Sequence, residues 1–355
     1  MIKKLLITLT ILLLFSACHH EIDISLPEVK NKRVLFVGEY HDNYAHHINQ
    51  MKIIQKLHED GAKVAIGMEM FQRRFQPVID DYLAGKVDEK VFLQKSEYYK
   101  RWGYDYKLYK PIMIYAKENH IPVIALNLEK EITKKISRAG LDSLNLEEKK
   151  MIPKDLDFSV ESYKKRLLDV FNDPEHLAAM PKKYRPNPEY LYQSQILWDE
   201  TMADTTAKYL KSHPETIMIV LAGNGHLEHF IGIPNRVKRR IDIPMSILLQ
   251  DCEKEDGKAD QYLFPKSIMI EPTPKLGIHL ELQGLKVTSV IKNSLAEKLG
   301  IEEKDSIIEV DGIPTKELAD LKLALYLYHE RIGLPLESKE LSIRVKRGDK
   351  EIVLR

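Results

Sequence analysis

The chain has 355 residues, with 54 Lys and Arg residues against 53 Asp and Glu residues and a formal charge of +1. This balance excludes a protein that binds nucleic acid through a large positive excess, so no nucleic-acid partner is expected. With 44% hydrophobic and 30% charged residues the chain is expected to fold, and its length predicts about two domains. Two cysteines are too few for a disulfide scaffold or a cysteine-rich zinc fold.

Residues 1–17 have the pattern of a secretory signal peptide. Two lysines precede an apolar or hydroxyl run over Leu5–Phe15, which is too short to span a bilayer, since a membrane helix takes about 20 residues. The tetrapeptide Phe-Ser-Ala-Cys at 15–18 resembles a bacterial lipobox, with phenylalanine where leucine is usual. We therefore expect cleavage after residue 17 and lipidation of Cys18. The alternative is an ordinary signal peptide with an incidental cysteine.

A lipidated Cys18 would hold the protein in the cell envelope by a lipid anchor. The next residue is His19 rather than aspartate, which by analogy with lipoprotein sorting predicts the outer membrane if the cell is Gram-negative. Residues 18–32 are polar with one proline and are expected to form a tether. Lipidation leaves Cys252 alone, so no internal disulfide is expected.

Residues 33–262 are predicted to form one domain of alternating strands and helices. Apolar runs predict strands at 33–37, 63–68, 121–126, 216–222 and 244–249. Helical spacing and capping signals predict helices at 41–60, 71–84, 111–119, 128–139 and 187–211, with irregular helices between 140 and 190. The alternation implies an α/β fold with a mainly parallel sheet flanked by helices. In such sheets, ligands bind beyond the carboxyl ends of the strands.

Polar side chains follow these predicted strands. The strand ends read Gly-Glu-Tyr-His at 38–41, Gly-Met-Glu at 67–69, Asn127, and Gly-Asn-Gly-His at 223–226. Because the carboxyl ends of parallel strands share one edge, we expect His41, Glu69 and His226 to converge, with Glu39, Asn127 and Asn224 beside them. A glycine before each histidine suits either a turn with positive φ or a close approach of two backbones.

Three interpretations of this cluster stay open from the residues alone. Two imidazoles and a carboxylate could bind Zn²⁺ or another divalent metal. One histidine could instead take a proton from water while Glu69 orients that water. The third interpretation is structural: the histidines are helix-start residues satisfied by backbone, and Glu69 caps a helix.

Four segments of this domain carry a family resemblance, and they occur in the expected order. They are Gly-Glu-Tyr-His-Asp-Asn-x-x-His-His at 38–47, Gly-Met-Glu-Met-Phe at 67–71, Tyr-Gln-x-Gln-x-x-x-Asp-x-x-Met-Ala at 192–203 and Ala-Gly-Asn-Gly-His at 222–226. Over about residues 30–250 the chain resembles the ChaN-type haem-binding lipoproteins of the Tiki-like superfamily. The resemblance implies haem or iron uptake.

The superfamily also includes hydrolases, namely the Tiki proteases and erythromycin esterases. The resemblance places His41, Glu69 and His226 in the site that these proteins share. It also implies an arginine in that site, whose identity stays open. The candidates are Arg73 and Arg74, which closely follow Glu69, and Arg185 and Arg236.

A haem site needs an apolar slot, an axial ligand and cations for the propionates. Met68, Met70 and Phe71 could supply apolar walls, and a phenolate or an imidazole could ligate ferric iron. The tyrosines that cluster next in the chain are Tyr98, Tyr99, Tyr104, Tyr106, Tyr109 and Tyr115. Most of these are expected to be ordinary helix-surface rings. The resemblance implies haem bound by a surface tyrosine in a homodimer, so the axial ligand stays open.

Residues 268–355 are predicted to form a second, small β-rich domain. Leu-Gly-Ile at 276–278, a short helix from Ser294 to Gly300, a turn at Asp311-Gly312 and a helix at 318–328 together resemble a bacterial PDZ domain. The resemblance implies that Leu276, Gly277 and Ile278 receive the C-terminal carboxylate of a partner peptide, which adds a strand beside 277–282. The alternative is a domain that only dimerises or packs on the first.

The sequence therefore predicts a membrane-anchored lipoprotein that binds haem for uptake and recruits a peptide or protein partner through its PDZ domain. The alternative is a metal- or His/Glu-dependent hydrolase, a protease or an esterase, in which His41 is base or ligand, Glu69 holds the water and His226 completes the site. A third possibility is a scaffold without a ligand.

Overall fold

The computed structural model describes residues 31–173, 185, 187–281, 284–332 and 341–355. The predicted signal peptide, Cys18 and all but the last two residues of the predicted tether lie outside these ranges. Among the helices that the structure describes, none is both long and apolar enough to cross a bilayer.

A six-stranded sheet forms the centre of the first domain, in the order β3-β2-β4-β1-β5-β6, and each neighbouring pair is parallel. Its strands are β1 (Val34–Glu39), β2 (Val64–Gln72), β3 (Val123–Asn127), β4 (Ile217–Gly223), β5 (Met245–Gln250) and β6 (Gln261–Leu263). Strands β1, β2 and β4 are buried along their whole length, as strands covered on both faces must be. The predicted parallel α/β architecture is confirmed.

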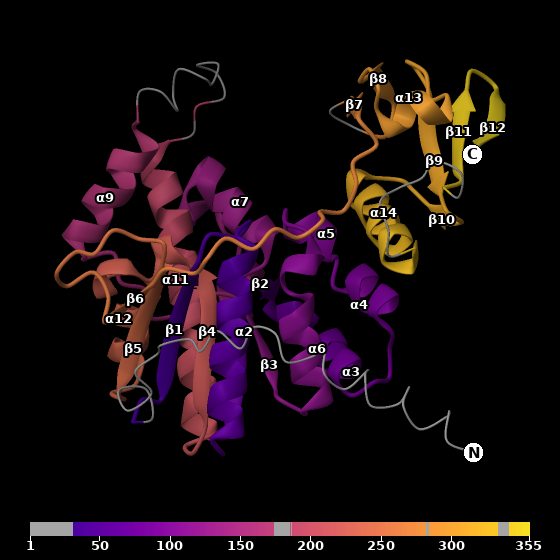
Figure 1. Ribbon diagram of the computed structural model, residues 1–355. Helices are drawn as coiled ribbons and strands as arrows, with labels where there is room; N and C mark the ends of the chain where they lie inside the picture. Colours follow the sequence, from indigo (N-terminus) through magenta and orange to yellow (C-terminus); the bar gives the residue numbers. More distant parts are fainter. Residues whose placement is uncertain (1–30, 174–184, 186, 282–283, 333–340) are drawn as a thin grey trace, which may run out of the picture.

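Helices cover both faces of this sheet (Figure 1). They are α2 (Tyr44–Glu59), α3 (Gln76–Leu83), α4 (Glu89–Lys95), α5 (Tyr98–Arg101), α6 (Lys110–Glu118), α7 (Lys130–Ala139), α8 (Leu146–Lys150), α9 (Glu161–Phe171), α11 (Pro188–Ser212) and α12 (Ile233–Arg240). Alternate residues of β1 enter two different hydrophobic clusters. Leu35 and Val37 share a cluster with α2 residues, whereas Val34 and Phe36 share one with residues of α11 and α12.

Side-chain caps fix where the helices beside the strand ends begin. Asn43 accepts a hydrogen bond from the backbone of Ala45 and so starts α2 directly after the first Gly-x-x-His segment. Asn187 does the same for α11, and Pro188 occupies its first turn, where a missing N–H costs nothing.

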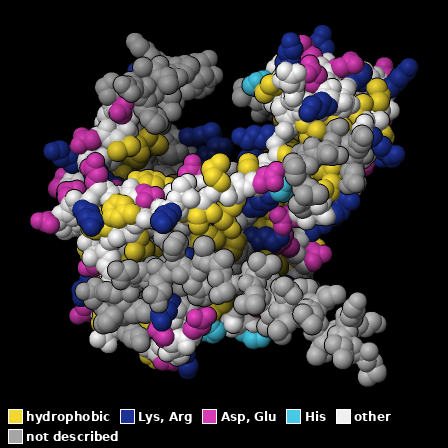
Figure 2. Space-filling view, in the orientation of Figure 1, with side chains coloured by type: hydrophobic (Ala, Val, Ile, Leu, Met, Phe, Trp, Pro, Cys, Tyr) yellow, Lys and Arg dark blue, Asp and Glu magenta, His cyan; other side chains and the backbone are white. Residues whose placement is uncertain are grey.

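Two predicted elements differ from the structure. The helix expected over 71–84 begins only at Gln76, because β2 continues to Gln72 and a short 3-10 turn (Arg73–Phe75) follows it. The strand-like segment 267–270 pairs with nothing: residues 264–277 form an extended linker, in which Met269 is 91% exposed. Figure 2 shows hydrophobic side chains gathered across the middle of the face along which this linker runs in Figure 1.

The second domain is a small antiparallel β-rich unit, as predicted. One sheet has the order β10-β9-β11-β12, and β7 pairs with β8. Its elements are β7 (Ile278–Leu280), β8 (Val287–Val290), α13 (Leu295–Leu299), β9 (Ser306–Val310), β10 (Ile313–Pro314), α14 (Leu318–Ile332), β11 (Ile343–Arg347) and β12 (Lys350–Leu354). Ser294 caps α13 and Gly300 ends it with φ of 79°, both as expected from the sequence. The end of the expected ligand-bearing strand, 282–283, lies outside the described residues.

Helix α14 belongs to the cores of both domains. One face, with Leu321 and Leu325, packs into the hydrophobic cluster of the PDZ-like unit. The other face carries Leu323 and Tyr326 into the cluster of the first domain, where the Tyr326 ring lies 6.0 Å from the ring of Tyr99. The two domains therefore share a helix rather than being joined by the linker alone.

Candidate functional site

The carboxyl ends of four neighbouring strands bring the predicted site residues together. Strands β3, β2, β4 and β1 lie side by side in the sheet. Asn127 ends β3, and Glu69 lies three residues before the end of β2. His226 and His41 follow the ends of β4 and β1 within three residues. The structure thus brings the two histidines and the glutamate to one rim, as the sequence predicts.

Close approach, not positive φ, explains the glycines that precede the histidines. A Cβ on Gly38 would lie 2.0 Å from Asn224 Oδ1, and one on Gly223 would lie 3.0 Å from Cε1 of His41. Neither Gly38 nor Gly223 has a positive φ. The two segments therefore need glycine because each packs its backbone against a side chain of the other.

His226 lies between two buried carboxylates. Its Nδ1 is 2.5 Å from Asp199 Oδ1, and its Nε2 is 3.3 Å from Glu69 Oε1. The second oxygen of Glu69 accepts a hydrogen bond of 2.9 Å from the backbone of Gly223. With both ring nitrogens facing carboxylates, His226 is held as a double donor.

These contacts decide the charge of the pair. Burial alone would raise the pKa of Glu69 and lower the pKa of His226. The attraction between them is stronger: the charge and hydrogen bond of His226 lower the pKa of Glu69 to about 2. Glu69 and Asp199 in turn hold the pKa of His226 well above its usual range. At neutral pH the site therefore contains an imidazolium between two carboxylates.

His41 forms a second histidine–carboxylate pair. Its Nδ1 donates to Glu39 Oε1 at 2.7 Å, which leaves Nε2 facing the site. Burial works against a charged His41, but the hydrogen bond to Glu39 and the charge of Glu69 raise its pKa. Glu39 is fixed in turn by the Tyr109 hydroxyl at 2.7 Å and the Gln50 amide at 2.8 Å. Although burial favours its neutral form, the charges and hydrogen bonds of nearby histidines lower the pKa of Glu39.

Aromatic rings line the site. The rings of Trp102 and Tyr104 lie 4.9 and 5.0 Å from the ring of His41. On the other side, the Trp198 ring lies 6.2 Å from that of His226. Aromatic rings therefore flank both histidines of the site.

The predicted neighbours of the site have mixed outcomes. Asn127 donates to the backbone oxygen of Glu69 at 2.9 Å and so positions that residue. Asn224 is buried and donates to the backbone of Gln250 at 3.0 Å. Arg73 and Arg74 face Glu129 and Glu97, at 3.8 and 3.6 Å, and their place in the site stays a prediction. They diverge because the chain turns through a 3-10 helix directly after β2.

Arg236 reaches the site only through other residues. It is fully buried, its Nε lies 3.2 Å from Glu200, and its guanidinium lies over the ring of Tyr163 at 5.4 Å. The Tyr163 hydroxyl donates to the free oxygen of Asp199, the partner of His226. Arg236 is therefore connected to His226 through Tyr163 and Asp199.

Sequence reasoning missed Asp199 as a site residue. It lies in the middle of α11, among residues that face the protein interior. From the sequence alone, a charged residue is not expected to be buried at such a position. A signal was present, because Asp199 is the acid of the Tyr-Gln-x-Gln-x-x-x-Asp segment that carries the family resemblance. Its neighbour Gln195 also lies 3.1 Å from Nδ1 of His226.

The geometry does not match a metal centre. Among the described residues, no group of three or more His, Cys, Asp or Glu side chains is arranged to hold a metal ion. His226 explains why, since Asp199 and Glu69 occupy both of its nitrogens. The expectation that His41, Glu69 and His226 jointly ligate Zn²⁺ is therefore not supported by their arrangement.

The tyrosine cluster is sorted by burial. Tyr98, Tyr106 and Tyr109 are at most 1% exposed, and Tyr99 and Tyr115 are partly buried. Tyr104 is 37% exposed, more than any other of the six. It borders a cavity of about 590 Å³, here called the linker groove, between residues 103–108 and the linker. Apolar side chains of this groove are Leu108, Ile268, Met269, Ile270 and Pro272.

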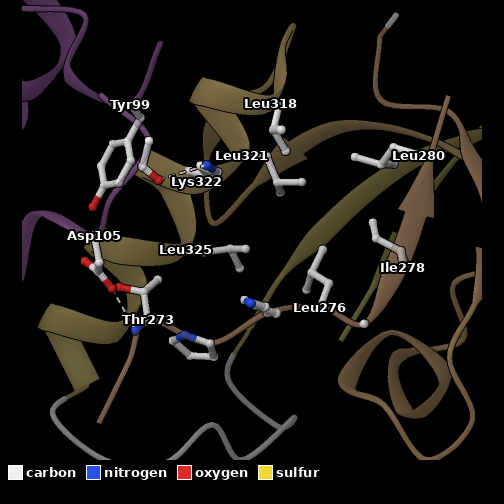
Figure 3. A pocket seen from close by; sticks show the side chains of 14 residues that line it. Tyr99, Asp105, Thr273, Leu276, Ile278, Leu280, Leu318, Leu321, Lys322 and Leu325 are labelled. Atoms are coloured by element: carbon white, nitrogen blue, oxygen red, sulfur yellow. Dashed lines mark hydrogen bonds between the residues drawn. The ribbon is translucent and has the colours of Figure 1, made fainter. Parts of the chain in front are cut away.

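A second groove lies in the PDZ-like domain, between β7 and α14 (Figure 3). Its volume is about 440 Å³, and Leu276, Gly277 and Ile278 line it as predicted. Gly277 has φ of 80°, and a Cβ there would lie 2.3 Å from Cβ of Ser294. Both the backbone conformation and the lack of space therefore require glycine at this position. We call this cavity the PDZ groove.

Comparisons with protein families give two matches. A family model described as haem-binding uptake, Tiki superfamily, ChaN matches residues 25–237, well over half of the chain. A PDZ domain model matches residues 267–328.

Comparisons with individual proteins give weaker likenesses. The fold is similar to that of ChaN of Campylobacter jejuni with cofacially bound haem, with a TM-score of 0.54 and 18% identity over 68% of this chain and 91% of that one. An erythromycin esterase variant in its open conformation gives a TM-score of 0.40 and 14% identity, over 64% and 71% of the two chains. RETICULATA-RELATED 5, a chloroplastic protein of Arabidopsis thaliana, is 20% identical over 241 residues, 63% of this chain but only 32% of the relative's length.

Proposed function

We propose that this chain, which belongs to the haem-binding uptake, Tiki superfamily, ChaN family and carries a PDZ domain, binds haem in the linker groove beside His41. The observation that carries the proposal is Tyr104. It is the exposed tyrosine of its cluster, its ring contacts His41, and it borders a groove with an apolar wall formed by the linker. A phenolate is an accepted axial ligand of ferric haem, which supplies the redox-active iron when bound.

The groove offers haem what an apolar macrocycle needs. Ile268, Met269 and Pro272 of the linker form one wall, and Leu108 forms part of the other. A flat apolar ring placed there would cover Met269, which is otherwise 91% exposed. Asp42 and Asp105 also border the groove, so the anionic propionates are expected to point away from them toward solvent.

A haemin titration tests this proposal. Residues 19–355 should shift the Soret band of haemin on binding, and Tyr104→Phe should weaken binding roughly tenfold or more, since it removes an iron ligand. Tyr115→Phe is the matched control, because Tyr115 is a partly buried tyrosine of the same cluster that bonds to His58. Unchanged spectra and affinity in Tyr104→Phe would reject this ligand, and no Soret shift in the parent chain would reject haem binding.

We further propose that the PDZ groove binds the C-terminal residues of a partner protein. The groove is apolar, with Ile278 on β7 facing Leu321 and Leu325 on α14. Leu318→Glu is a suitable probe, because Leu318 lines the groove yet is 50% exposed, so folding should tolerate the change. It should abolish capture of C-terminal peptides from a peptide library displayed with free carboxyl ends; equal capture by both proteins would show that the groove is not the site.

The lipobox leads us to propose an envelope location, with the protein anchored by lipid on Cys18 and taking part in haem uptake. The expected result is that Cys18→Ser releases the protein from membrane fractions. Membrane association that survives this change would contradict a lipid anchor.

Family resemblance also leads us to propose a haem-linked homodimer, which light scattering should detect as a doubling of mass when haemin is added.

One observation favours a second function, hydrolysis. His41 donates to the buried Glu39 and keeps Nε2 free, which is the arrangement of a general base oriented by a carboxylate. In that mechanism Nε2 takes a proton from water while Glu39 holds the imidazole through Nδ1. Because the pKa of His41 is raised, the rate should climb as pH rises through that pKa, and His41→Asn should abolish it. A panel of nitrophenyl esters and peptides that gives no turnover above the His41→Asn background would exclude this function.

A further inference from the structure

A short segment of the first domain touches both grooves of the molecule. This coupling segment comprises residues 102–107, between α5 and α6. On its inner side, the rings of Trp102 and Tyr104 contact His41 at centroid distances of 4.9 and 5.0 Å. Trp102 and Tyr104, the two rings on the His41 side of the site, thus lie in a segment without regular secondary structure at those positions.

On its outer side the same segment holds the entry to the PDZ domain. The backbone of Thr273 donates to Asp105 Oδ2 at 2.9 Å. Lys107 donates to the backbone oxygen of Glu271 at 3.0 Å and also contacts His329 of α14. Thr273 lies only three residues before Leu276, where the carboxylate-receiving loop begins.

The PDZ groove itself is built by both domains. Besides β7 and α14, its lining includes Tyr99, Gly103 and Asp105 of the first domain (Figure 3). Lys322, on the groove side of α14, donates to the backbone oxygen of Gly103 at 3.4 Å. A ligand that fills this groove therefore contacts the coupling segment directly.

We propose that occupation of the PDZ groove changes the position of Trp102 and Tyr104 against His41, through the coupling segment and its hydrogen bond to Thr273. The physical reason is that an apolar ligand must find room between β7 and α14, while Thr273, Lys322 and His329 tie both elements to residues 103–107. Coupling of this kind is reciprocal, so a ligand on the His41 side changes the affinity of the PDZ groove by the same factor. Ligand binding to the PDZ domain then regulates the arrangement of the aromatic rings around His41.

The test fills the groove covalently, so that its occupation is certain. Leu318→Cys is made in residues 19–355 and reacted with N-benzylmaleimide, whose apolar ring suits the leucines of the groove. Cys252 is 6% exposed and should not react, which mass spectrometry checks. The chain has two tryptophans, so Trp198→Phe leaves Trp102 as the only indole reporter.

The measurement is the emission of Trp102 and its quenching by acrylamide. Labelled Leu318→Cys should show roughly a twofold change in the quenching constant of Trp102. The reason is that the filled groove shifts the populations of the conformations of the coupling segment. Val353→Cys, at an exposed position of β12 away from the groove, is the matched control and should show none. Thr273→Pro removes the backbone donor to Asp105 and should reduce the response of the labelled groove.

Each outcome decides the proposal. An unchanged Trp102 signal in fully labelled Leu318→Cys overturns it. An equal change in labelled Val353→Cys also overturns it, because the effect would then be general. A full response in Thr273→Pro overturns the route through the hydrogen bond. These readouts do not depend on haem or on any catalysed reaction.

Discussion

The two histidines of the site differ in their number of carboxylate partners. His226 has a buried carboxylate on each nitrogen, whereas His41 has Glu39 on one nitrogen only. The first arrangement fixes a proton and a charge, and the second leaves a nitrogen that faces the rim. Residues of one type at equivalent strand ends therefore have unequal chemistry.

The Glu69–His226 pair should make stability depend on pH. The pKa of Glu69 falls from 4.5 to about 2 on folding, so its contribution is present above pH 4.5 and is lost as pH falls toward 2. His226 has a raised pKa, so its contribution is present below 6.5 and is lost as pH rises through the raised value.

Glu69→Gln is the variant that isolates the acidic limb. It should lower the free energy of unfolding by at most about 3 kcal/mol near pH 5, with a smaller difference at pH 3, where the native carboxylate begins to lose its advantage. Urea unfolding at both pH values measures this. If the difference in the free energy of unfolding between the two proteins is larger at pH 3 than at pH 5, Glu69 is not ionised in the folded protein.

Haem affinity should rise with pH if Tyr104 is the ligand. Partial burial, followed by the charges of Asp42, Glu69 and Glu39, raises the pKa of Tyr104, so iron must displace a proton to bind the phenolate. We expect about a tenfold gain in haemin affinity per pH unit between pH 7 and 9, the slope for release of one proton. Spectroscopic titrations at pH 7, 8 and 9 measure it. The Tyr104→Phe chain is the control, and an equal slope in it would assign the proton elsewhere.

At this scale the sequence identified His41, Glu69 and His226, because polar residues that directly follow apolar strands must meet at one rim. Asp199 was not predicted, because helical spacing indicates only that a residue faces the interior. It does not indicate that the carboxylate pairs with a histidine there. The direction of Arg73 and Arg74 could not be predicted for a different reason. Nearness to Glu69 in the chain says nothing about direction once the strand ends in a tight turn.

At the level of elements, the site depends on how closely the end of β1 meets the segment after β4. Gly38 is the contact point, since a Cβ there would lie 2.0 Å from Asn224 Oδ1. Gly38→Ala should destabilise the fold by roughly 1–3 kcal/mol, the usual cost of overpacking. Gly103→Ala is the matched control, because a Cβ there would meet no atom within 4 Å. Thermal unfolding compares them, and equal melting temperatures would show that the strand ends have room.

The short strand β6 (Gln261–Leu263), with two of its three residues partly exposed, was not predicted. The other five strands of the sheet were predictable because each is a short and largely buried apolar run. The linker was not, since residues 267–270 have an apolar content that suits a strand but no partner to pair with. An apolar pattern indicates that a segment can be buried. Whether the segment pairs as a strand depends on whether the sheet has a free edge beside it. The exposed Ile268 and Met269 that result are part of the groove proposed for haem.

For the whole molecule, the shared helix α14 joins two domains into one cooperative unit. Tyr326 is fully buried, donates to Glu89 at 2.7 Å and packs against Tyr99 and Tyr106. The sequence predicted this helix as an element of the PDZ-like domain. It could not predict the second buried face, because only the first domain's surface gives that face a partner.

Tyr326 provides the test of this cooperation. Tyr326→Ala should cost on the order of 3 kcal/mol or more and split one calorimetric transition into two, because it opens a cavity at the junction. Tyr326→Phe keeps the ring and should cost about 1 kcal/mol without splitting the transition. Two transitions already present in the parent chain would contradict a common core.

The central claim is that haem lies in the linker groove with its iron on Tyr104, beside the histidine–carboxylate rim. A crystal structure of residues 19–355 grown with haemin tests it most directly. The account predicts iron bonded to Oη of Tyr104, with the macrocycle against Ile268 and Met269. Haem bound at another surface, or iron ligated by a different side chain, would contradict it.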